Sequence, residues 1–262
     1  MSDSLTQYSA IAYVYDVLNS EVDYASWAKM LDGLITKYMP EKPELVLDLA
    51  CGTGKITREL SALGYDMIGV DLSADMLSCA IENTAPELGV LYLNQNMCDF
   101  ELYGTVGAAV CCLDSINYLT EDGELEDCLA CVHNYLDPDG IFIFDVNSPY
   151  KFESVYSNNA YVLEGELPGS GAEIFCGWQN CFDPESGLCD FFLTVFTENE
   201  DGTYSRQDEQ QTERCYTREE LENALVRTGF ELLEVASDLH DPEYEGKEQR
   251  LFFVARCKKN TD

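Results

Sequence analysis

The sequence predicts an α/β fold in which a mostly parallel sheet of seven strands carries helices on both faces, with an antiparallel β meander inserted before its last helix. Two observations support this prediction. From residue 45 to residue 146, short apolar stretches alternate with amphipathic ones, which is typical of parallel strands joined by helices. After about residue 150, long strand-like stretches are separated by turn residues, which is typical of an antiparallel meander.

Two helices are predicted ahead of the sheet, over residues 8–18 and 23–39. The second has apolar residues at helical spacing, namely Trp27, Met30, Leu31, Leu34 and Ile35. Pro40 and Pro43 end this region, because proline cannot continue a helix. We therefore expect a helical cap over residues 1–40.

The elements of the sheet follow in order. They are strand 45–50, helix 54–63, strand 66–71, helix 73–84, strand 90–94, strand 107–113, helix 121–136 and strand 140–146. The chain returns to the sheet with a helix over 217–228, ended by Gly229, and strands over 230–236 and 250–256. Residues 1–148 and 217–262 are thus predicted to form one main domain.

The inserted subdomain, residues 149–216, is predicted to contain a meander of strands over 175–182, 188–197 and 203–216. Residues 183–187 and 198–202 separate them and are rich in turn formers. A meander at this place in a parallel sheet can sit above the strand ends. We interpret it as a lid or substrate platform, with a purely structural extension as the alternative.

The charge of the chain restricts its partners. Forty-nine acidic residues against 15 basic ones give a net charge of −34. This field repels phosphate backbones and anionic membrane surfaces, so neither nucleic acid nor membrane is an expected partner. The acidity either keeps the chain in solution or attracts a cationic substrate, and composition leaves both open.

The cysteines and the N-terminus favour the cytoplasm. The 12 cysteines are scattered through predicted strands and helices, where thiols serve as small apolar groups. The close pair Cys128 and Cys131 has no second pair at zinc-finger spacing, so core packing competes there with metal binding. The first residues lack the basic start and apolar stretch of a secretory signal, and no apolar run approaches the roughly 20 residues of a membrane span.

A glycine-rich loop carries the chemistry. The first strand runs through Asp48 into Cys51-Gly52-Thr53-Gly54 and then into a helix. Glycines let the backbone pass beneath a ligand, and helix N-terminal amides hold polar groups there. Asp71 ends the next strand, where a carboxylate can accept both hydroxyl protons of a ribose. The pattern therefore predicts a nucleoside-containing ligand.

A nicotinamide dinucleotide is the first alternative to consider. Its fingerprint requires a third small residue at position 57, where this chain has Thr57. Asp48 lies inside the strand, where a carboxylate can reach the ammonium of a methionine moiety. S-adenosylmethionine is therefore the favoured cofactor, although a nicotinamide oxidoreductase stays a distant alternative.

The runs VLDLACGTG (46–54) and GVDLSADML (69–77) closely resemble motif I and the acidic loop of class I S-adenosylmethionine-dependent methyltransferases. LDPDGIFIFD (136–145) and RLFFVAR (250–256) resemble later strands of that family. The resemblance implies a Rossmann-like fold with the insertion described above. Further runs resemble a bacterial group of small-molecule-type enzymes whose acceptors are mostly unassigned, with sugar-amine and glycine N-methyltransferases as more distant relatives; these runs are YSAIAYVYD (8–16), CLDSINYL (112–119) and FDVNS (144–148).

The resemblance implies specific roles. Asp71 would hold the ribose, Leu72 and Met97 would flank the adenine, and Asn96 would meet its amino group. The complete set of expected cofactor-binding residues is Tyr8, Tyr15, Trp27, Asp48, Ala50, Gly52, Gly54, Asp71, Leu72, Met76, Asn96, Met97, Leu113 and Tyr118. No metal site is expected.

Three positions depart from the family pattern. Asn96 replaces the usual aspartate and can still accept one hydrogen bond. Ala50 replaces a glycine, a change that we expect to be tolerated if the backbone there is extended. Gln211 stands where relatives often carry a histidine, so any deprotonation by that histidine must be done otherwise.

The aromatic residues Tyr8, Tyr15 and Trp27 could cover the sulfonium, with helix packing as their alternative. Acceptor groups are expected where strands end or where the meander approaches them, and the candidates are Asp114, Asn117, Tyr118, Asp145, Asn147 and Trp178. Of these, Asp114 and Asn147 are predicted to position the substrate.

The predicted function is transfer of a methyl group from S-adenosylmethionine to nitrogen or oxygen of a small-molecule acceptor, by in-line displacement. The alternative from another class is a non-catalytic module that binds S-adenosylmethionine or S-adenosylhomocysteine. Gln211 and the lack of an unmistakable base motivate that alternative.

Overall fold

The computed structural model describes residues 11–237 and 246–259. The strands of the larger sheet are β1 (Leu45–Leu49), β2 (Asp66–Asp71), β3 (Leu91–Asn94), β4 (Val106–Cys111), β5 (Leu136–Asn147), β10 (Phe230–Ala236) and β11 (Arg250–Cys257). Their order is β10-β11-β5-β4-β1-β2-β3. Only β11 runs against its neighbours, because it pairs antiparallel with both β5 and β10. The predicted seven-stranded, mostly parallel, Rossmann-like sheet is confirmed.

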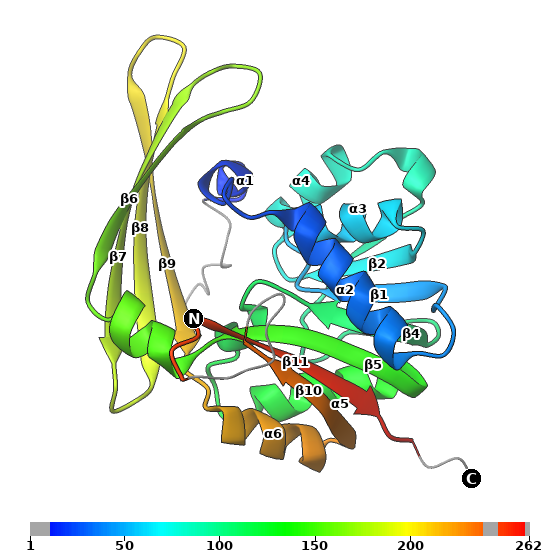
Figure 1. Cartoon of the computed structure of the whole chain (residues 1–262). Coiled ribbons are helices and arrows are strands. Elements are labelled where there is room, and N and C mark those ends of the chain that lie inside the picture. Colours follow the sequence, from blue (N-terminus) through cyan, green and yellow to red (C-terminus); the bar gives the residue numbers. More distant parts are fainter. Residues whose placement is uncertain (1–10, 238–245, 260–262) are drawn as a thin grey trace.

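Helices cover both faces of this sheet (Figure 1). They are α2 (Tyr24–Tyr38), α3 (Lys55–Ala62), α4 (Ala74–Glu82), α5 (Glu124–Tyr135) and α6 (Arg218–Arg227). Neighbouring residues of β1 show the two layers: Val46 packs with Leu31 of α2, whereas Leu47 packs with Leu129 of α5. Successive side chains of a strand point to opposite faces, so the almost continuously apolar strands are buried on both sides.

The inserted region forms a separate four-stranded antiparallel sheet, seen at the left of Figure 1. Its strands are β6 (Ala160–Glu166), β7 (Glu173–Asp183), β8 (Leu188–Glu198) and β9 (Tyr204–Arg214). The two predicted hairpins are present, with Gly187 and Gly202 at φ of 71° and 76° in the turns. β6 was not predicted, because its residues are mostly exposed and show no clear apolar alternation.

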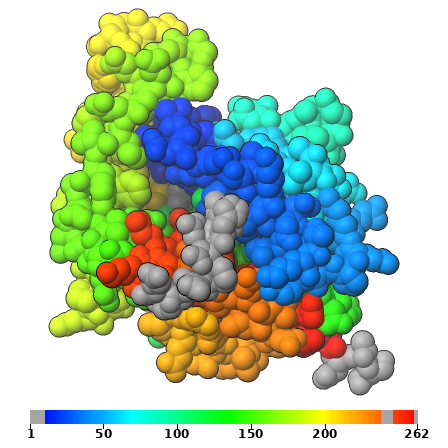
Figure 2. Space-filling view, viewed as in Figure 1, coloured from blue at the N-terminus to red at the C-terminus, as the bar shows by residue number. Residues whose placement is uncertain are grey.

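Two short helices connect the sheets. The first, η3 (Lys151–Tyr156), is a π-helix that follows β5 and packs against β7. The second, α1 (Tyr15–Leu18), is preceded by a turn at residues 11–14, so within the described part of the predicted 8–18 helix only the last turn is α-helical. Figures 1 and 2 show this N-terminal segment, in dark blue, between the four-stranded sheet and the cyan helices of the main domain.

The packing of the N-terminal segment explains its position. Ile11 and Val14 are buried against Ile174 and Phe191 of the four-stranded sheet. Ala12 is buried on the opposite side, against Met76 of α4. The segment therefore packs against the four-stranded sheet on one side and against α4 of the seven-stranded sheet's helical layer on the other. Within the described ranges, every helix is too short or too polar to cross a membrane.

Candidate active site

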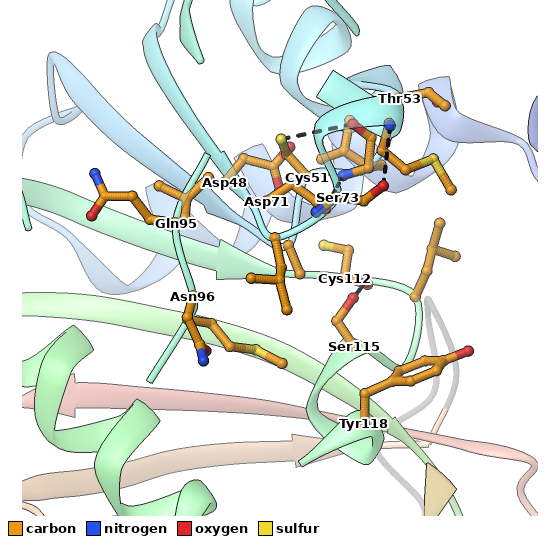
Figure 3. A pocket seen from close by; sticks show the side chains of 18 of the residues that line it. Asp48, Cys51, Thr53, Asp71, Ser73, Gln95, Asn96, Cys112, Ser115 and Tyr118 are labelled. Atoms are coloured by element: carbon orange, nitrogen blue, oxygen red, sulfur yellow. Dashed lines mark hydrogen bonds between the residues drawn. The ribbon is translucent and has the colours of Figure 1, made fainter. Parts of the chain in front are cut away.

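A cavity of about 440 Å³ opens at the carboxyl ends of β1, β2 and β4. This volume is within the range of small-molecule sites, and parallel sheets bind ligands at this edge. The predicted cofactor residues that line it are Tyr15, Asp48, Ala50, Gly52, Asp71, Leu72, Met76, Asn96, Met97, Leu113 and Tyr118. Figure 3 shows Asp48, Asp71 and Ser73 on one side of the space, Gln95 and Asn96 on a second, and Ser115 and Tyr118 on a third.

The two glycines of the loop play different parts. Gly52 has φ of 54°, and within the described chain no atom lies within 4 Å of the place that a Cβ would take. This open space is where the backbone can approach a ligand. Gly54, at φ of 74°, caps α3 and does not line the cavity. A Cβ there would lie 2.4 Å from the hydroxyl of Tyr92, so Gly54 shapes the loop from behind.

Asp48 is buried beneath the loop, with 2% of its surface exposed. The hydroxyl of Thr57, in the first turn of α3, donates a hydrogen bond of 2.5 Å to its Oδ2. Burial raises the pKa of Asp48 to about 7, although the hydrogen bond from Thr57 opposes the rise. Thr57, which departs from the dinucleotide fingerprint, is therefore the partner of the strand carboxylate. A cation in the cavity would favour the ionised form of Asp48.

Asp71 ends β2 and holds the loop through both carboxylate oxygens. Its Oδ2 accepts from the backbone N–H of Gly52 and its Oδ1 from that of Ser73, both at 2.8 Å. Burial raises the pKa of Asp71, and the two backbone donors oppose this rise. Each oxygen keeps a further lone pair for a ligand hydroxyl. The arrangement suits a vicinal diol such as that of a ribose.

The opposite rim is formed by the segment after β3. Leu72, directly after β2, is 57% exposed and also lines the cavity, whereas Met97, after β3, is partly buried against the core. Asn96 accepts a hydrogen bond from the backbone N–H of Cys98 at 2.9 Å through its Oδ1. That oxygen retains a second lone pair, so it can also accept the expected hydrogen bond from an adenine amino group.

The backbone at Ala50 differs from the conformation considered from the sequence. We expected alanine to be tolerated here if the backbone were extended, but Ala50 has φ of 56°, in the left-handed region. Directly after β1, the N–H of Cys51 still bonds to the carbonyl of Val70 on β2 at 3.0 Å, and the N–H of Gly52 bonds to Asp71, so Ala50 lies where β1 passes into the glycine loop. Alanine is strained in this left-handed conformation, which glycine adopts without strain.

The predicted aromatic cover is only partly at the cavity. Tyr15 lines it, as does Tyr24, which the sequence did not indicate. Trp27 instead lies in the core, where its ring is 5.3 Å from that of Phe252. Tyr24 lies three residues before Trp27, one helical turn closer to the loop, which is why helical spacing alone could not choose between them. Tyr8 lies outside the described residues.

A buried cluster of charged side chains adjoins the cavity. Asp114 forms an ion pair with Arg250 at 2.6 Å. Burial alone would raise the pKa of Asp114, but the positive charges of Arg250 and Lys151 lower it overall. Asn147 is fully buried, accepting from Lys151 Nζ at 2.8 Å and donating to Glu213 Oε2 at 2.8 Å. Burial raises the pKa of Glu213 well above its usual range.

Arg250, Lys151 and Glu213 were not predicted from sequence, because they come from β11, η3 and β9, which lie far apart along the chain. The side chain of Asn147 bonds to Tyr156, Lys151 and Glu213, and the two oxygens of Asp145 accept from the backbone N–H groups of Leu113 and Asp114, so these two residues hold the cluster together. Of the predicted acceptor groups, Tyr118 lines the cavity, and Asp114 lies between Leu113 and Ser115, which line it.

The four-stranded sheet reaches the cavity through Gln211. Tyr118, whose hydroxyl points away from the Asp48 side in Figure 3, donates to Gln211 Oε1 at 3.0 Å. Gln211 is 5% exposed, and its Nε2 has no partner within the described ranges. Trp178 packs instead against Tyr156 and Phe191 and does not line the cavity.

Comparisons with known proteins agree with this geometry. Residues 46–140 match the family model of a methyltransferase domain. The chain is 33% identical over 253 residues to "Putative methyltransferase YqeM" of Bacillus subtilis (strain 168), covering 96% of this chain and 98% of that protein. It is 28% identical over 222 residues to the dTDP-3-amino-3,6-dideoxy-alpha-D-glucopyranose N,N-dimethyltransferase of Streptomyces fradiae, covering 84% and 83%.

A solved structure supports the whole fold. The crystal structure of an S-adenosylmethionine-dependent methyltransferase from Clostridium acetobutylicum ATCC 824 matches with a TM-score of 0.81 at 28% identity, covering 96% of this chain and 99% of that one. The likeness therefore includes the inserted sheet as well as the main domain.

Proposed function

This chain belongs to the S-adenosylmethionine-dependent methyltransferases, and we propose that it methylates the nitrogen of a small-molecule amine. The observation that carries the proposal is the buried acidic cluster beside the cofactor cavity. Three carboxyl groups, Asp114, Asp145 and Glu213, face two basic groups, Arg250 and Lys151. Burial keeps a proton on Glu213 in the empty site, and when Glu213 is ionised one further positive charge, such as an acceptor ammonium, would balance the cluster.

The cavity residues fit the cofactor that the family uses. The open space at Gly52 and the two oxygens of Asp71 suit a ribose, whereas Asp48 suits an ammonium. Leu72, Met97 and Asn96, which all line the cavity, would hold the adenine. S-adenosylmethionine supplies the methyl group as a sulfonium.

Methyl transfer requires the acceptor lone pair to point along the carbon–sulfur bond, so positioning supplies much of the rate enhancement. The low pKa of Asp114 keeps it ionised, and it would accept a hydrogen bond from the acceptor N–H and orient the lone pair. Glu213, with its raised pKa, is suited to hold the proton that the amine releases. Two carboxyl groups thereby take different roles through their environments.

The inserted region, residues 149–216, would form the acceptor side of the site. The hydrogen bond from Tyr118 to Gln211 joins the cavity wall to β9 and leaves the amide nitrogen of Gln211 for a ligand oxygen. The N,N-dimethyltransferase name of the Streptomyces fradiae relative supports an amine acceptor carrying oxygen atoms. A small molecule, rather than nucleic acid or membrane, also agrees with the net charge of −34.

A screen tests the proposal. The protein is incubated with S-adenosylmethionine and a panel of small amines, each paired with the hydroxy compound of the same skeleton, and S-adenosylhomocysteine is measured. We expect turnover of at least one amine and faster turnover of amines than of their hydroxy partners. Preference for the hydroxy partners would contradict nitrogen as the acceptor. Binding of the cofactor without turnover of any compound would favour the non-catalytic module.

Two variants sharpen the screen. Asp71→Ala should weaken cofactor binding by about a hundredfold, since it removes ribose contacts and the support of the loop. Asp114→Asn should leave the cofactor Kd within about threefold but lower kcat by about thirtyfold, because it keeps the shape and removes the charge that orients the amine. An unchanged kcat in Asp114→Asn would contradict the assigned role.

A further inference from the structure

The segment that follows β4 has an unusual backbone. Leu113 and Asp114 have φ of 58° and 59°, so two consecutive residues other than glycine adopt the left-handed conformation. Each is strained there and persists only where the surrounding structure holds it. The strained turn forms one wall of the cofactor cavity, which Leu113 and Ser115 line directly. Some feature of the protein must therefore stabilise this turn.

Asp145 at the end of β5 is that feature. Its Oδ1 accepts from the backbone N–H of Leu113 at 2.7 Å, and its Oδ2 accepts from the backbone N–H of Asp114 at 2.9 Å. Two successive N–H groups that point to the same side form a concavity for an anion, and the side chain of Asp145 is 1% exposed within it. The carboxylate thus binds the turn only while Leu113 and Asp114 keep their left-handed form.

Arg250, the first residue of β11, forms ion pairs with both Asp114 and Asp145. One guanidinium nitrogen pairs with Asp145 Oδ2 and the other with Asp114 Oδ1. The guanidinium also lies over the ring of Trp27, 5.5 Å from its centroid. Asp114 is therefore held twice, through its backbone by Asp145 and through its side chain by Arg250. Burial raises the pKa of Asp145, and the positive charge of Arg250 opposes this rise by favouring the ionised carboxylate.

We propose that Asp145 is a positioning residue for methyl transfer, which holds the Leu113–Asp114 turn in its left-handed form and so builds this wall of the cofactor cavity. The residue contacts neither cofactor nor acceptor in this role, and acts through the turn. The inference depends on the cofactor cavity alone and is independent of the acceptor. It also explains why Asp145, a candidate acceptor group from sequence, has its oxygens directed at protein donors.

The test uses Asp145→Asn, which keeps the shape of the side chain and removes its charge. Amide exchange at Leu113 and Asp114 is followed by NMR, and the Kd of S-adenosylhomocysteine is measured by calorimetry. We expect exchange about a hundredfold faster at these two amides and a Kd about tenfold higher. The control is Glu234→Gln on β10, which removes a carboxylate bound to Lys37 and Tyr38 outside the cavity and should change neither readout.

A second background separates positioning of the turn from general loss of structure. Glycine adopts a left-handed backbone without strain, so Leu113→Gly should make the turn less dependent on Asp145. In the Leu113→Gly background, Asp145→Asn should raise the Kd by less than about threefold. An equal tenfold effect in both backgrounds, or unchanged exchange and Kd in Asp145→Asn, would overturn the proposal.

If Asp145→Asn does not fold, Arg250→Lys takes its place, because it keeps the charge and loses the fork that spans both carboxylates. The expected changes in exchange and Kd have the same direction, and their absence would equally overturn the proposal. Since no readout uses an acceptor, a failure of the amine screen would leave this test unaffected.

Discussion

The carboxylate of Asp16 in α1 accepts a hydrogen bond of 2.6 Å from the hydroxyl of Thr53 in the glycine loop. Its second oxygen forms an ion pair with Lys55, the first residue of α3, at 3.3 Å. The segment that carries Asp16 is also packed against the four-stranded sheet through Ile11 and Val14. The N-terminal segment therefore links the cofactor loop to the region proposed to hold the acceptor.

Removal of this link should weaken cofactor binding. In Asp16→Ala the loop loses a hydrogen bond to a charged group, worth about 1.5 kcal/mol, so we expect the Kd of S-adenosylmethionine to rise about tenfold. Calorimetry measures it. Asp208→Ala, which removes an exposed ion pair of 2.9 Å with Arg206 on the four-stranded sheet, is the control and should leave the Kd unchanged. Equal affinities of Asp16→Ala and the wild type would show that the loop does not need α1.

Cofactor affinity should depend on pH through Asp48. Its pKa of about 7 lies above the ~3.9 of an exposed aspartate, so the folded cofactor-free chain carries a proton between these values that the unfolded chain has lost. The contribution of Asp48 to stability therefore decreases as pH rises from about 4 to 7 and is constant above. The cofactor ammonium favours the ionised carboxylate, so the Kd should be about tenfold higher at pH 6 than at pH 8.

Asp48→Asn provides the control for this prediction. The variant cannot ionise at this position, so its Kd should be higher than that of the wild type but nearly equal at pH 6 and pH 8. Thermal melting of both proteins without cofactor, over the same range, checks the stability part. If the variant keeps the pH dependence of the wild type, another group such as Asp71, whose pKa is also raised by burial, is responsible.

Ala50→Gly should stabilise the protein. Glycine has no Cβ to strain the left-handed backbone at φ of 56°, so the free energy of unfolding should increase by about 1 kcal/mol in urea titrations. Ala130→Gly, at an exposed position inside α5, should instead decrease it by about 1 kcal/mol, because glycine disfavours a helix. A decrease in both variants would contradict the assignment of strain to Ala50.

The main sheet could be predicted from sequence because its strands are short, apolar on both faces and separated by amphipathic helices. β2 matches its predicted bounds, 66–71. β4 ends at Cys111, two residues earlier than predicted, because Leu113 belongs to the left-handed turn that Asp145 stabilises. That contact comes from a residue 32 positions later, so no local pattern could reveal it.

In the site, too, residues in local motifs were predicted and residues brought in by distant contacts were not. The residues of the glycine loop and of the segments after β2 and β3 were predicted, since they are local motifs next to strands. Tyr24, Arg250, Lys151 and Glu213 were not, because each reaches the site only through tertiary packing. A sequence signal existed for Arg250 alone, which begins a strand that resembles the last strand of the family.

Helix α1 packs closely against β6, where Val17 faces Gly165. A Cβ at Gly165 would lie 2.4 Å from Cγ1 of Val17, so in Gly165→Ala the side chain of Val17 must shift, and we expect α1, which carries it, to move away from the four-stranded sheet. We expect a loss of about 1–3 kcal/mol in the free energy of unfolding, which is usual for an overpacked contact. The cofactor Kd should rise as well, by about threefold, because the displaced helix carries Asp16.

Two variants identify the cause. Gly177→Ala lies inside β7, where within the described chain no atom comes within 4 Å of the added methyl, and it should leave both stability and Kd unchanged. Val17→Ala removes the clashing Cγ1, so adding Gly165→Ala in that background should cost less than about 0.5 kcal/mol. If Gly165→Ala lowers stability but leaves the Kd unchanged, the packing of α1 on the sheet is independent of its hold on the loop. A rise in Kd that disappears in the Val17→Ala background would instead establish that the two sheets communicate through this helix.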